Sequence, residues 1–473
     1  MPELKRTAVL NIVGLTEGLL GAHTPRLNSF RQRGALSHIV PAFPAVTCSA
    51  QTDYVTGKTP TEHGIVANGW YNRELAEVQF WKQANQVVQA PKIWDELRAA
   101  APGFTCAKLF WWYNMYSTAD YSLTPRPLYP ADGRKFFDVY AWPYSLRTEV
   151  KAALGDFPFP GFWGPAAGVD SPQGSADCAT RWIANSAKFT EEKYRPTLSL
   201  VYLPHLDYNL QRLGPNHPAI AKDLCEIDAI AGELIEFYEA RGVQVLALSE
   251  YGITPVDTAI HLNRIFREQG WLTIKEELGR ELLDAGASRV FAVADHQVAH
   301  LYVNDRALLG DVRALVEKIP GVERVLGAEE KIAAGIAHSR AGDLIAVARE
   351  HAWFTYYYWL DDRVAPDFAR CVDIHRKPGY DPVELFLDPK IPAVKLRILF
   401  RLLQKKLGFR MLMDVIPLDA TLVKGSHGAR PANRADWPVL LCSPSVARVP
   451  GELASTAIYG VIRDAVLGRR VRR

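Results

Sequence analysis

The sequence alternates between short β-rich runs and amphipathic helices, and this alternation constrains the fold more than any other feature. Amphipathic stretches at about 178–193 and 218–241 each lead into a β-rich run. Thr24 and Pro25 supply an N-cap and a first-turn proline for an earlier helix, which Gly34 can close. The β-rich runs are 7–15, 37–43, 105–112, 197–203 and 243–249. Such alternation predicts an α/β fold with a mostly parallel central sheet flanked by helices, and ligands at the carboxyl ends of its strands.

Two segments interrupt this alternation. Residues 111–165 are dense in Trp, Tyr, Phe and Pro, so we expect an aromatic cap over a pocket. Residues 280–415 begin with the strands VFAVAD and AHLYV and end with a basic amphipathic helix at 391–408, which predicts a second α/β insertion. Because 48% of the 473 residues are apolar, the chain can bury one large core. We therefore expect a single domain over 1–473 that carries both insertions.

Charge and cysteine usage narrow the partners and the compartment. A net charge of +3 gives no strong attraction to nucleic acid or to an anionic membrane. The sequence has no run of about 18 apolar residues that would span a membrane, and its start lacks the apolar region and cleavage site of a secretory signal. The cysteines are scattered and form no Cys-x-x-Cys pair, which is typical of reduced thiols. We expect a cytoplasmic protein that acts on a small molecule, with neither nucleic acid nor membrane as a partner.

The most informative segment is 41–68, PAFPAVTCSAQTDYVTGKTPTEHGIVAN. Thr47 lies where a loop ends and a helical run through about Val55 begins. Its hydroxyl would therefore stand at a helix N-terminus, where backbone N–H groups and the helix dipole favour anions such as a phosphoryl group. On this local pattern alone, a simple N-cap is the favoured interpretation of Thr47.

The longer pattern resembles the nucleophile region of the nucleotide pyrophosphatase/phosphodiesterases, a branch of the alkaline phosphatase superfamily. The shared order is Thr47, Thr56-Gly57, Pro60, His63-Gly64-Ile65 and Asn68. Members of that family use the threonine as a nucleophile and the asparagine to hydrogen-bond a phosphoryl oxygen. The resemblance implies these roles for Thr47 and Asn68, and hydrolysis of a small phosphorylated or nucleotide-like metabolite through a phospho-threonine intermediate.

The same resemblance implies a site for divalent metal, with zinc as the expected ion. The residues that match the family's ligand positions are Asp207, Glu250 and His427. At three other positions the expected carboxylate or imidazole ligand is replaced, by Val13, Gln211 and Tyr251. An amide and a phenol of high pKa are poor zinc donors, and valine is none. The resemblance implies two ions, and the altered ligands permit one, or a site of different metal preference.

The second insertion offers replacement ligands. Asp373 and His375 share one face of an extended segment, two residues apart, as a chelating pair would. Their segment leads toward His427 and carries Arg376 and Lys377, which can meet phosphate oxygens. For these reasons we assign Asp373 and His375 to the metal and Arg376 and Lys377 to the substrate. A salt-bridged or capped loop explains the pair at least as well.

Two alternatives to this assignment stay open. Asp295 and His296 form another carboxylate-imidazole pair at a strand end. His205 lies two residues before Asp207, and on a strand the two side chains would share a face. A core or supporting role for His205 is an equally good interpretation.

Aromatic residues in the expected cap suggest how a substrate is held. Trp112 and Tyr113 offer flat faces on which a base or another apolar group can stack, although core packing explains them equally well. Two rival functions stay open. One is a non-catalytic protein that binds a phosphorylated metabolite, and the other is a transferase that passes the phosphoryl group from Thr47 to an acceptor other than water.

Overall fold

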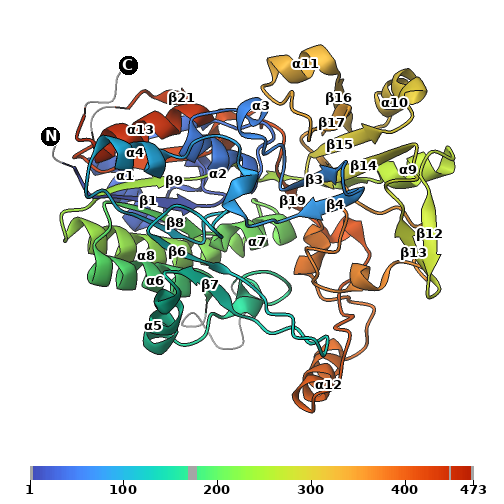
Figure 1. Ribbon diagram of the computed structural model, residues 1–473, viewed down its shortest axis with the longest axis horizontal. Helices are drawn as coiled ribbons and strands as arrows, with labels where there is room; N and C mark the ends of the chain where they lie inside the picture. The colour runs from blue at the N-terminus through green and yellow to red at the C-terminus, as the bar shows by residue number, and fades with distance from the viewer. Residues whose placement is uncertain (1–3, 169–177, 447–448, 470–473) are drawn as a thin grey trace.

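A nine-stranded sheet forms the centre of the computed structural model, which describes residues 4–168, 178–446 and 449–469 (Figure 1). Five adjacent strands at its centre, β9 (Gln244–Leu248), β1 (Thr7–Ile12), β8 (Leu198–Leu203), β5 (Cys106–Leu109) and β6 (Tyr121–Pro125), run parallel to one another. On either side of them, β20 (Val439–Cys442) is antiparallel to β9, and β7 (Val139–Trp142) is antiparallel to β6. In spatial order the strands are β21 (Glu452–Ala454), β2 (Ala35–Val40), β20 (Val439–Cys442), β9 (Gln244–Leu248), β1 (Thr7–Ile12), β8 (Leu198–Leu203), β5 (Cys106–Leu109), β6 (Tyr121–Pro125) and β7 (Val139–Trp142). The predicted α/β class with a mostly parallel central sheet is confirmed.

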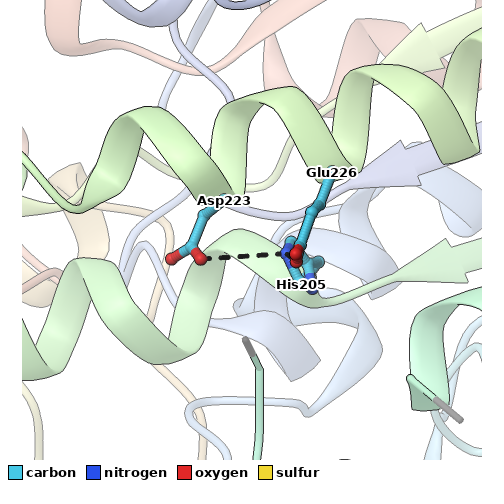
Figure 2. Close-up of side chains that lie close together, drawn as sticks. All are labelled: His205, Asp223 and Glu226. Atoms are coloured by element: carbon cyan, nitrogen blue, oxygen red, sulfur yellow. Dashed lines mark ion pairs between the residues drawn. The ribbon is translucent and has the colours of Figure 1, made fainter. Parts of the chain in front are cut away.

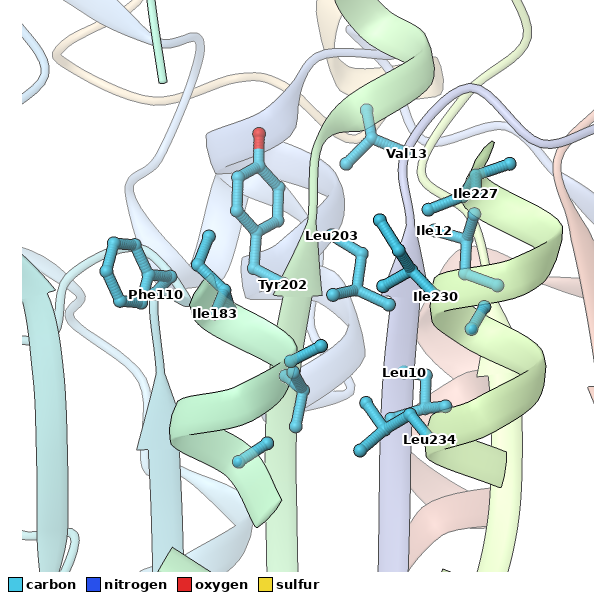
Figure 3. Close-up of a cluster of buried hydrophobic side chains, with 14 of the residues drawn as sticks. Leu10, Ile12, Val13, Phe110, Ile183, Tyr202, Leu203, Ile227, Ile230 and Leu234 are labelled. Carbon is cyan, nitrogen blue, oxygen red and sulfur yellow. The ribbon is translucent and has the colours of Figure 1, made fainter. Parts of the chain in front are cut away.

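Helices cover both faces of this sheet because its central strands are apolar on both sides. Along β1, Leu10 and Ile12 face one layer of helices and Val9 faces the other. Figure 3 shows Leu10 and Ile12 against Ile230 and its neighbours on α8. The first layer is α1 (Pro25–Arg33), α6 (Ala179–Tyr194) and α8 (Ile220–Glu239), and the second is α2 (Thr47–Thr56), α4 (Ile93–Ala100) and α13 (Ile458–Val466).

A second, four-stranded antiparallel sheet lies beside the central one and has its own apolar core (Figure 1). Its order is β14 (Val290–Asp295), β15 (Val298–Val303), β17 (Leu344–Ala348) and β16 (Val322–Leu326). All four strands fall within 280–415, the segment predicted as the second insertion. The turn between β14 and β15 consists of His296 and Gln297. The backbone N–H of Gln297 donates to the carbonyl of His427 at 2.8 Å. The second sheet therefore places a strand end against the central domain.

The aromatic segment 111–165 is built partly into the sheet. Its strands β6 and β7 extend the sheet at one edge, and Trp111 is buried in the apolar cluster under α4. Aromatic side chains at 129, 137 and 144 stay exposed instead. The segment thus supplies one edge of the sheet, and its role as a cap over a pocket stays a prediction.

The remaining elements are short or peripheral. Within the described residues no helix has the length and apolar character needed to cross a bilayer. The remaining helices are α3 (Pro60–His63), α5 (Tyr144–Leu154), α7 (His205–Leu213), α9 (Leu262–Glu268), α10 (Leu309–Val316), α11 (Ala328–Ala333) and α12 (Val394–Lys406). The remaining strands are β3 (Gly69–Asn72), β4 (Glu77–Phe80), β10 (Thr254–Pro255), β11 (Thr258–Ile260), β12 (Ile274–Glu277), β13 (Arg280–Leu283), β18 (Ala352–Phe354) and β19 (Gly425–Ser426).

Candidate active site

Thr47 is the first residue of α2, as the sequence predicted. Val46 before it is extended, and Gly57 ends the helix in the left-handed conformation that glycine favours. Every residue of α2 is buried, so its first N–H groups lie inside the protein near the carboxyl ends of β8 and β9. Glu250 and Tyr251 follow β9 directly, which brings them to the same corner. The strand-to-helix order of the chain thus assembles the site at the strand ends.

A chain of hydrogen bonds leads away from the Thr47 hydroxyl. The hydroxyl of Tyr251 lies 3.2 Å from Thr47 Oγ1 and donates to Asp207 Oδ1 at 3.0 Å. The other oxygen of Asp207 accepts from Gln211 Nε2 at 3.0 Å. Gln211 Oε1 in turn accepts from the hydroxyl of Tyr380 at 3.1 Å. Because the Tyr251 hydroxyl donates its hydrogen to Asp207, Thr47 must be the donor in the hydrogen bond between Thr47 and Tyr251.

Glu250 is the second carboxylate beside Thr47. Its Oε1 accepts from Asn11 Nδ2 at 2.5 Å and from Gln51 Nε2 at 2.6 Å. Its Oε2 is buried and has no hydrogen-bond partner among the described residues. Burial raises the pKa of Glu250 to about 8 and that of Asp207 to about 7, against the opposing effect of these hydrogen bonds. Carboxylates that titrate near neutrality are suited to take up and release a proton at physiological pH.

Four rings lie in a row beside Thr47, with stacked pairs at the two ends and a tilted pair in the middle. Ring centroids are 3.5 Å apart for Tyr251 and His427, 3.7 Å for His427 and His296, and 3.6 Å for His296 and Tyr380. His427 Nδ1 lies 2.7 Å from the carbonyl of Ala45, a pure acceptor, so Nδ1 carries the hydrogen and Nε2 the lone pair. Burial lowers the pKa of both histidines well below the usual value, which keeps them neutral. Their Nε2 atoms have no hydrogen-bond partner among the described residues.

Asn68 is held next to the start of α2. Its Oδ1 accepts from the backbone N–H of Cys48 at 3.0 Å, and its Nδ2 donates to Asp295 Oδ1 at 3.1 Å. Asp295 also accepts from the Asn68 backbone N–H and contacts His296 Nδ1 at 2.7 Å. Asn68 Nδ2 carries a second hydrogen that these contacts leave unused. The pair Asp295 and His296, which the sequence analysis ranked second, is the one that the structure brings to Asn68 and His427.

The predicted metal ligands do not form a dinuclear zinc site of the implied kind. Among the described residues, no three of the predicted ligands have donor atoms within 4.8 Å of one another. Val13 is fully buried among apolar side chains and offers no donor (Figure 3). Burial raises the pKa of the Tyr251 phenol well above its usual value, and both ends of Gln211 already make hydrogen bonds. The donors needed for two ions are thus replaced or already engaged.

Among the described residues, Asp373 and His375 make hydrogen-bond contacts with Glu384 and Phe80, and not with the residues around Thr47. The backbone N–H of Asp373 donates to Glu384 Oε1 at 2.8 Å, and His375 Nδ1 lies 3.4 Å from the carbonyl of Phe80. The segment that carries both residues instead brings Tyr380 to Gln211. The assignment of Asp373 and His375 to a metal stays a prediction, and the contacts found here do not support it.

Arg376 and Lys377 differ sharply in their surroundings. Lys377 Nζ is buried between Asp381 Oδ2 at 2.7 Å and Glu384 Oε1 at 2.8 Å. The two carboxylates raise the pKa of Lys377 although burial opposes the rise. Arg376 is exposed and lies 3.5 Å from Asp367. Lys377 therefore neutralises protein carboxylates, and the predicted phosphate contacts of both residues stay untested.

His205 does not share a face with Asp207, contrary to the expectation of a strand. Both residues lie in the first turn of α7, where side chains two positions apart point to different sides. His205 points toward Asp223 and Glu226 on α8, as Figure 2 shows. The expectation failed because β8 ends at Leu203, two residues before His205.

Trp112 and Tyr113 lie against α2 near the site. The backbone N–H of Trp112 donates to Gln51 Oε1 at 2.7 Å, and its ring centroid is 4.8 Å from that of Trp81. Tyr113 packs in the same apolar cluster as Cys48. Both residues also line a small cavity together with Gln51. Their predicted role in stacking a substrate stays a prediction.

Sequence reasoning missed Asn11, Gln51 and Tyr380. Asn11 had a signal, because it is a polar residue inside the otherwise apolar run of β1, where a buried amide needs a partner. Gln51 gave a weaker signal, because it is a polar residue in a helix whose residues are all buried. Tyr380 had none, because only the packing of the second insertion brings it to α7.

Comparison with known proteins places this arrangement in a wider group. The family model described as type I phosphodiesterase/nucleotide pyrophosphatase matches residues 7–381. An uncharacterized pyrophosphatase/phosphodiesterase of Schizosaccharomyces pombe is 26% identical over 266 residues. That alignment covers 52% of this chain and 46% of the relative, so the chain spans about half the length of the curated protein it matches.

Two solved structures are similar over nearly their whole length. Murine ectonucleotide pyrophosphatase/phosphodiesterase 5 matches with a TM-score of 0.58 and 15% identity, over 99% of this chain and 96% of that one. Phosphonoacetate hydrolase from Sinorhizobium meliloti matches with a TM-score of 0.60 and 14% identity, over 98% of this chain and 96% of that one. At such low identity these two likenesses show the fold.

Proposed function

Because this chain belongs to the type I phosphodiesterase/nucleotide pyrophosphatase family, we propose that it hydrolyses a phosphoric ester or anhydride of a small metabolite, with Thr47 as the nucleophile. One observation carries the proposal. The Thr47 hydroxyl stands at the start of α2 and donates toward Tyr251 at 3.2 Å, with the free oxygen of Glu250 in the same buried corner. A hydroxyl at a helix N-terminus beside a titratable carboxylate can attack phosphorus and lose its proton.

The proposed reaction has two balanced steps. Thr47 Oγ1 forms a bond to phosphorus as the bond to the leaving oxygen breaks, and the hydroxyl proton passes to Glu250. Water then attacks the phospho-threonine, and the Thr47 oxygen leaves with the proton held by Glu250. One proton of the water stays on the phosphate or phosphate ester that departs, and the other passes through solvent to the leaving oxygen of the first step. The first N–H groups of α2 and the unused Asn68 hydrogen would hold the non-bridging oxygens.

No step of this proposal passes through a metal. Val13, Gln211 and Tyr251 do not fit the dinuclear zinc site that the resemblance implies. Within the site, the donor atoms that have no hydrogen-bond partner among the described residues include the Nε2 atoms of His296 and His427 and Oε2 of Glu250. Whether turnover also requires one bound divalent ion can be tested by metal analysis of His427→Ala.

Binding without turnover is the second candidate function. It is favoured by Tyr251, which links Thr47 to Asp207 at the position where the family resemblance implies a metal ligand. The Thr47 side chain is also only 4% exposed. This candidate predicts that phosphorylated metabolites bind and are recovered unchanged.

The pH dependence of turnover tests the role of Glu250. Since burial raises its pKa to about 8 and a base acts only when deprotonated, kcat/KM should rise with pH and level off above about 8. Glu250→Gln should lower kcat/KM by about 10²-fold or more and remove this rise. The measurement is hydrolysis of bis(p-nitrophenyl) phosphate across about pH 5 to 10.

Glu77→Gln is the matched control, because Glu77 is exposed on β4. It should keep both the rate and the pH profile. A rise with pH that persists unchanged in Glu250→Gln would show that another group activates Thr47. Running the reaction in heavy-oxygen water separates hydrolysis from transfer, because only hydrolysis puts the label into the phosphate product.

A further inference from the structure

We propose that His205, Asp223 and Glu226 bind a divalent transition cation, with zinc as the best match, at a site separate from Thr47. Among the described residues they are the one group of three His, Cys, Asp or Glu side chains whose donor atoms all lie within 4.8 Å of one another (Figure 2). His205 begins α7, and the two acids lie three residues apart on the facing side of α8. The packing of two helices therefore assembles the group.

The distances suit a metal better than a network of hydrogen bonds. His205 Nε2 is 3.1 Å from Glu226 Oε2 and 4.0 Å from Asp223 Oδ1. Ligands at about 2.0–2.2 Å from a tetrahedral zinc ion are about 3.3–3.5 Å apart. The two separations thus lie on either side of the value for ligands of one zinc ion, and all three donor atoms lie within 4.8 Å of one another.

Unsatisfied polar atoms provide the second observation. Asp223 is 1% exposed, and neither of its carboxylate oxygens makes a hydrogen bond of regular geometry among the described residues, although Asn209 and His205 lie close to it. His205 Nε2 likewise has no hydrogen bond among the described residues, and its contact with Glu226 at 3.1 Å is an ion pair. Leaving buried polar atoms unpaired is costly, and a cation aimed at all three would remove that cost.

The far side of the imidazole is also arranged as in metal sites. Cys178 Sγ lies 3.7 Å from His205 Nδ1, so the thiol orients the ring and leaves Nε2 to face the acids. Glu226 is 25% exposed, which gives an ion and a water ligand a route from solvent. Three protein donors and one water would complete a tetrahedral zinc site.

Metal analysis of the whole chain tests this site. After dialysis with zinc and then metal-free buffer, we expect the wild type to hold one zinc more per chain than Asp223→Asn or His205→Ala. Cys178→Ser should weaken zinc binding by about 10-fold or more. Cobalt substitution should give visible absorption bands in the wild type that Asp223→Asn lacks.

Two control variants keep the result unambiguous. Glu233→Gln, on the same helix, should keep the full zinc content, and His427→Ala, at the Thr47 site, should keep the zinc that Asp223→Asn loses. Asp223→Asn is nearly isosteric, and its circular dichroism checks the fold. A wild type that takes up no zinc, or zinc that is lost in His427→Ala and kept in Asp223→Asn, would overturn the proposal.

We propose independently that α12 docks the protein on an anionic lipid surface. The helix has no buried residue and lies at one end of the molecule, away from both sheets (Figure 1). Val394 and Ile398 are half-buried against the apolar core that includes the second sheet, whereas the other large apolar side chains of α12 are exposed, from 67% at Leu396 to 49% at Leu402. The exposed apolar residues of this region are Leu396, Leu399, Phe400, Leu402, Leu403, Leu407, Phe409 and Leu412. An apolar surface of this size on a helix indicates a covering partner.

Charge complementarity selects the lipid surface. The sequence between Asp388 and Asp414 contains no acidic residue. Its basic residues are Lys390, Lys395, Arg397, Arg401, Lys405, Lys406 and Arg410. The chain as a whole carries only +3, so this segment is far more basic than the rest. Interleaved Leu, Phe, Lys and Arg on one exposed helix are typical of helices that lie in the headgroup region of anionic membranes.

A neighbouring segment extends the same surface. Lys405 Nζ lies 5.6 Å from the ring centroid of Phe136 and 5.2 Å from that of Phe137, and Arg410 Nε donates to the carbonyl of Asp132. Phe136 and Phe137 are both exposed. Aromatic rings beside basic side chains suit the boundary between headgroups and acyl chains. The near-neutral charge of the whole chain therefore averages out a local concentration of basic residues.

Sedimentation with vesicles tests this surface. The full chain should co-sediment with phosphatidylcholine vesicles that contain phosphatidylglycerol, and about 10-fold less with pure phosphatidylcholine or at high salt. Leu399→Glu with Phe400→Glu should abolish binding without lowering the melting temperature, because neither side chain is buried. Leu278→Glu, at a fully exposed leucine elsewhere, should bind as the wild type does. Equal sedimentation of both variants, or a dimer that binds no vesicles, would refute the proposal.

Discussion

Thr47→Ala is expected to reduce kcat/KM for a phosphodiester by at least about 10³-fold, because the substitution removes the attacking oxygen. The fold should survive the change. Tyr251 keeps its hydrogen bond to Asp207, and Glu250 keeps those from Asn11 and Gln51. Melting temperatures measured beside the kinetics would verify that only catalysis is affected.

Two comparison variants sharpen this result. Thr47→Ser retains the hydroxyl and should retain part of the activity and the phosphorylated intermediate. Thr52→Ala removes another buried hydroxyl one turn later on α2, where it donates to the carbonyl of Cys48, and should keep turnover. Full activity in Thr47→Ala would disprove the nucleophile. If the wild type binds phosphorylated metabolites and converts none of a broad panel, binding without turnover is the function.

Lys377→Met is expected to lower the free energy of unfolding by about 3–5 kcal/mol. Lys377 Nζ is the cation between the carboxylates of Asp381 and Glu384, and all three side chains are at most 2% exposed. Removing the ammonium group leaves two buried carboxylates facing each other, so at least one must take up a proton or be exposed to solvent. Urea unfolding followed by tryptophan fluorescence would measure the loss.

Arg376→Met is the control for this stability prediction, because Arg376 is exposed and its ion pair with Asp367 spans 3.5 Å. It should change the free energy of unfolding by less than about 1 kcal/mol. The same two variants also test the predicted phosphate contacts. A normal stability of Lys377→Met together with a raised KM would show that Lys377 serves the substrate rather than the fold.

The α/β architecture could be predicted because it depends on patterns of residues that lie close together in the sequence. The β-rich run at 7–15 became β1, and the helix expected from Pro25 to Gly34 became α1, because periodic burial and turn residues act over a few positions. The start of α2 at Thr47 followed from the same signals. The aromatic segment 111–165 was harder, since an edge strand and a covering loop can have the same composition, and its strands β6 and β7 joined the sheet.

The sequence placed Thr47 at the start of a helix, which the structure has. Asp207 and Glu250 came from the family resemblance as metal ligands, and their roles stay predictions. The structure places the Tyr251 hydroxyl between Thr47 and Asp207.

The partners across the site depend on how distant segments pack. The sequence analysis preferred Asp373 and His375 to Asp295 and His296, whereas the structure brings the second pair to the site. His296 reached His427 because the β14–β15 turn packs against the central domain, whereas the Asp373 segment packs beside Glu384 and Phe80.

The sequence by itself determined the α/β class, the family motifs and the three replaced ligand positions, because these depend on residue identity and spacing along the chain. Tertiary structure alone decided that Tyr251 bridges Thr47 and Asp207, that Lys377 is a buried counter-ion, and that His205 meets the acids of α8. The reason is physical: contacts between elements far apart in the chain form only when apolar faces pack, and burial then sets which polar groups must pair.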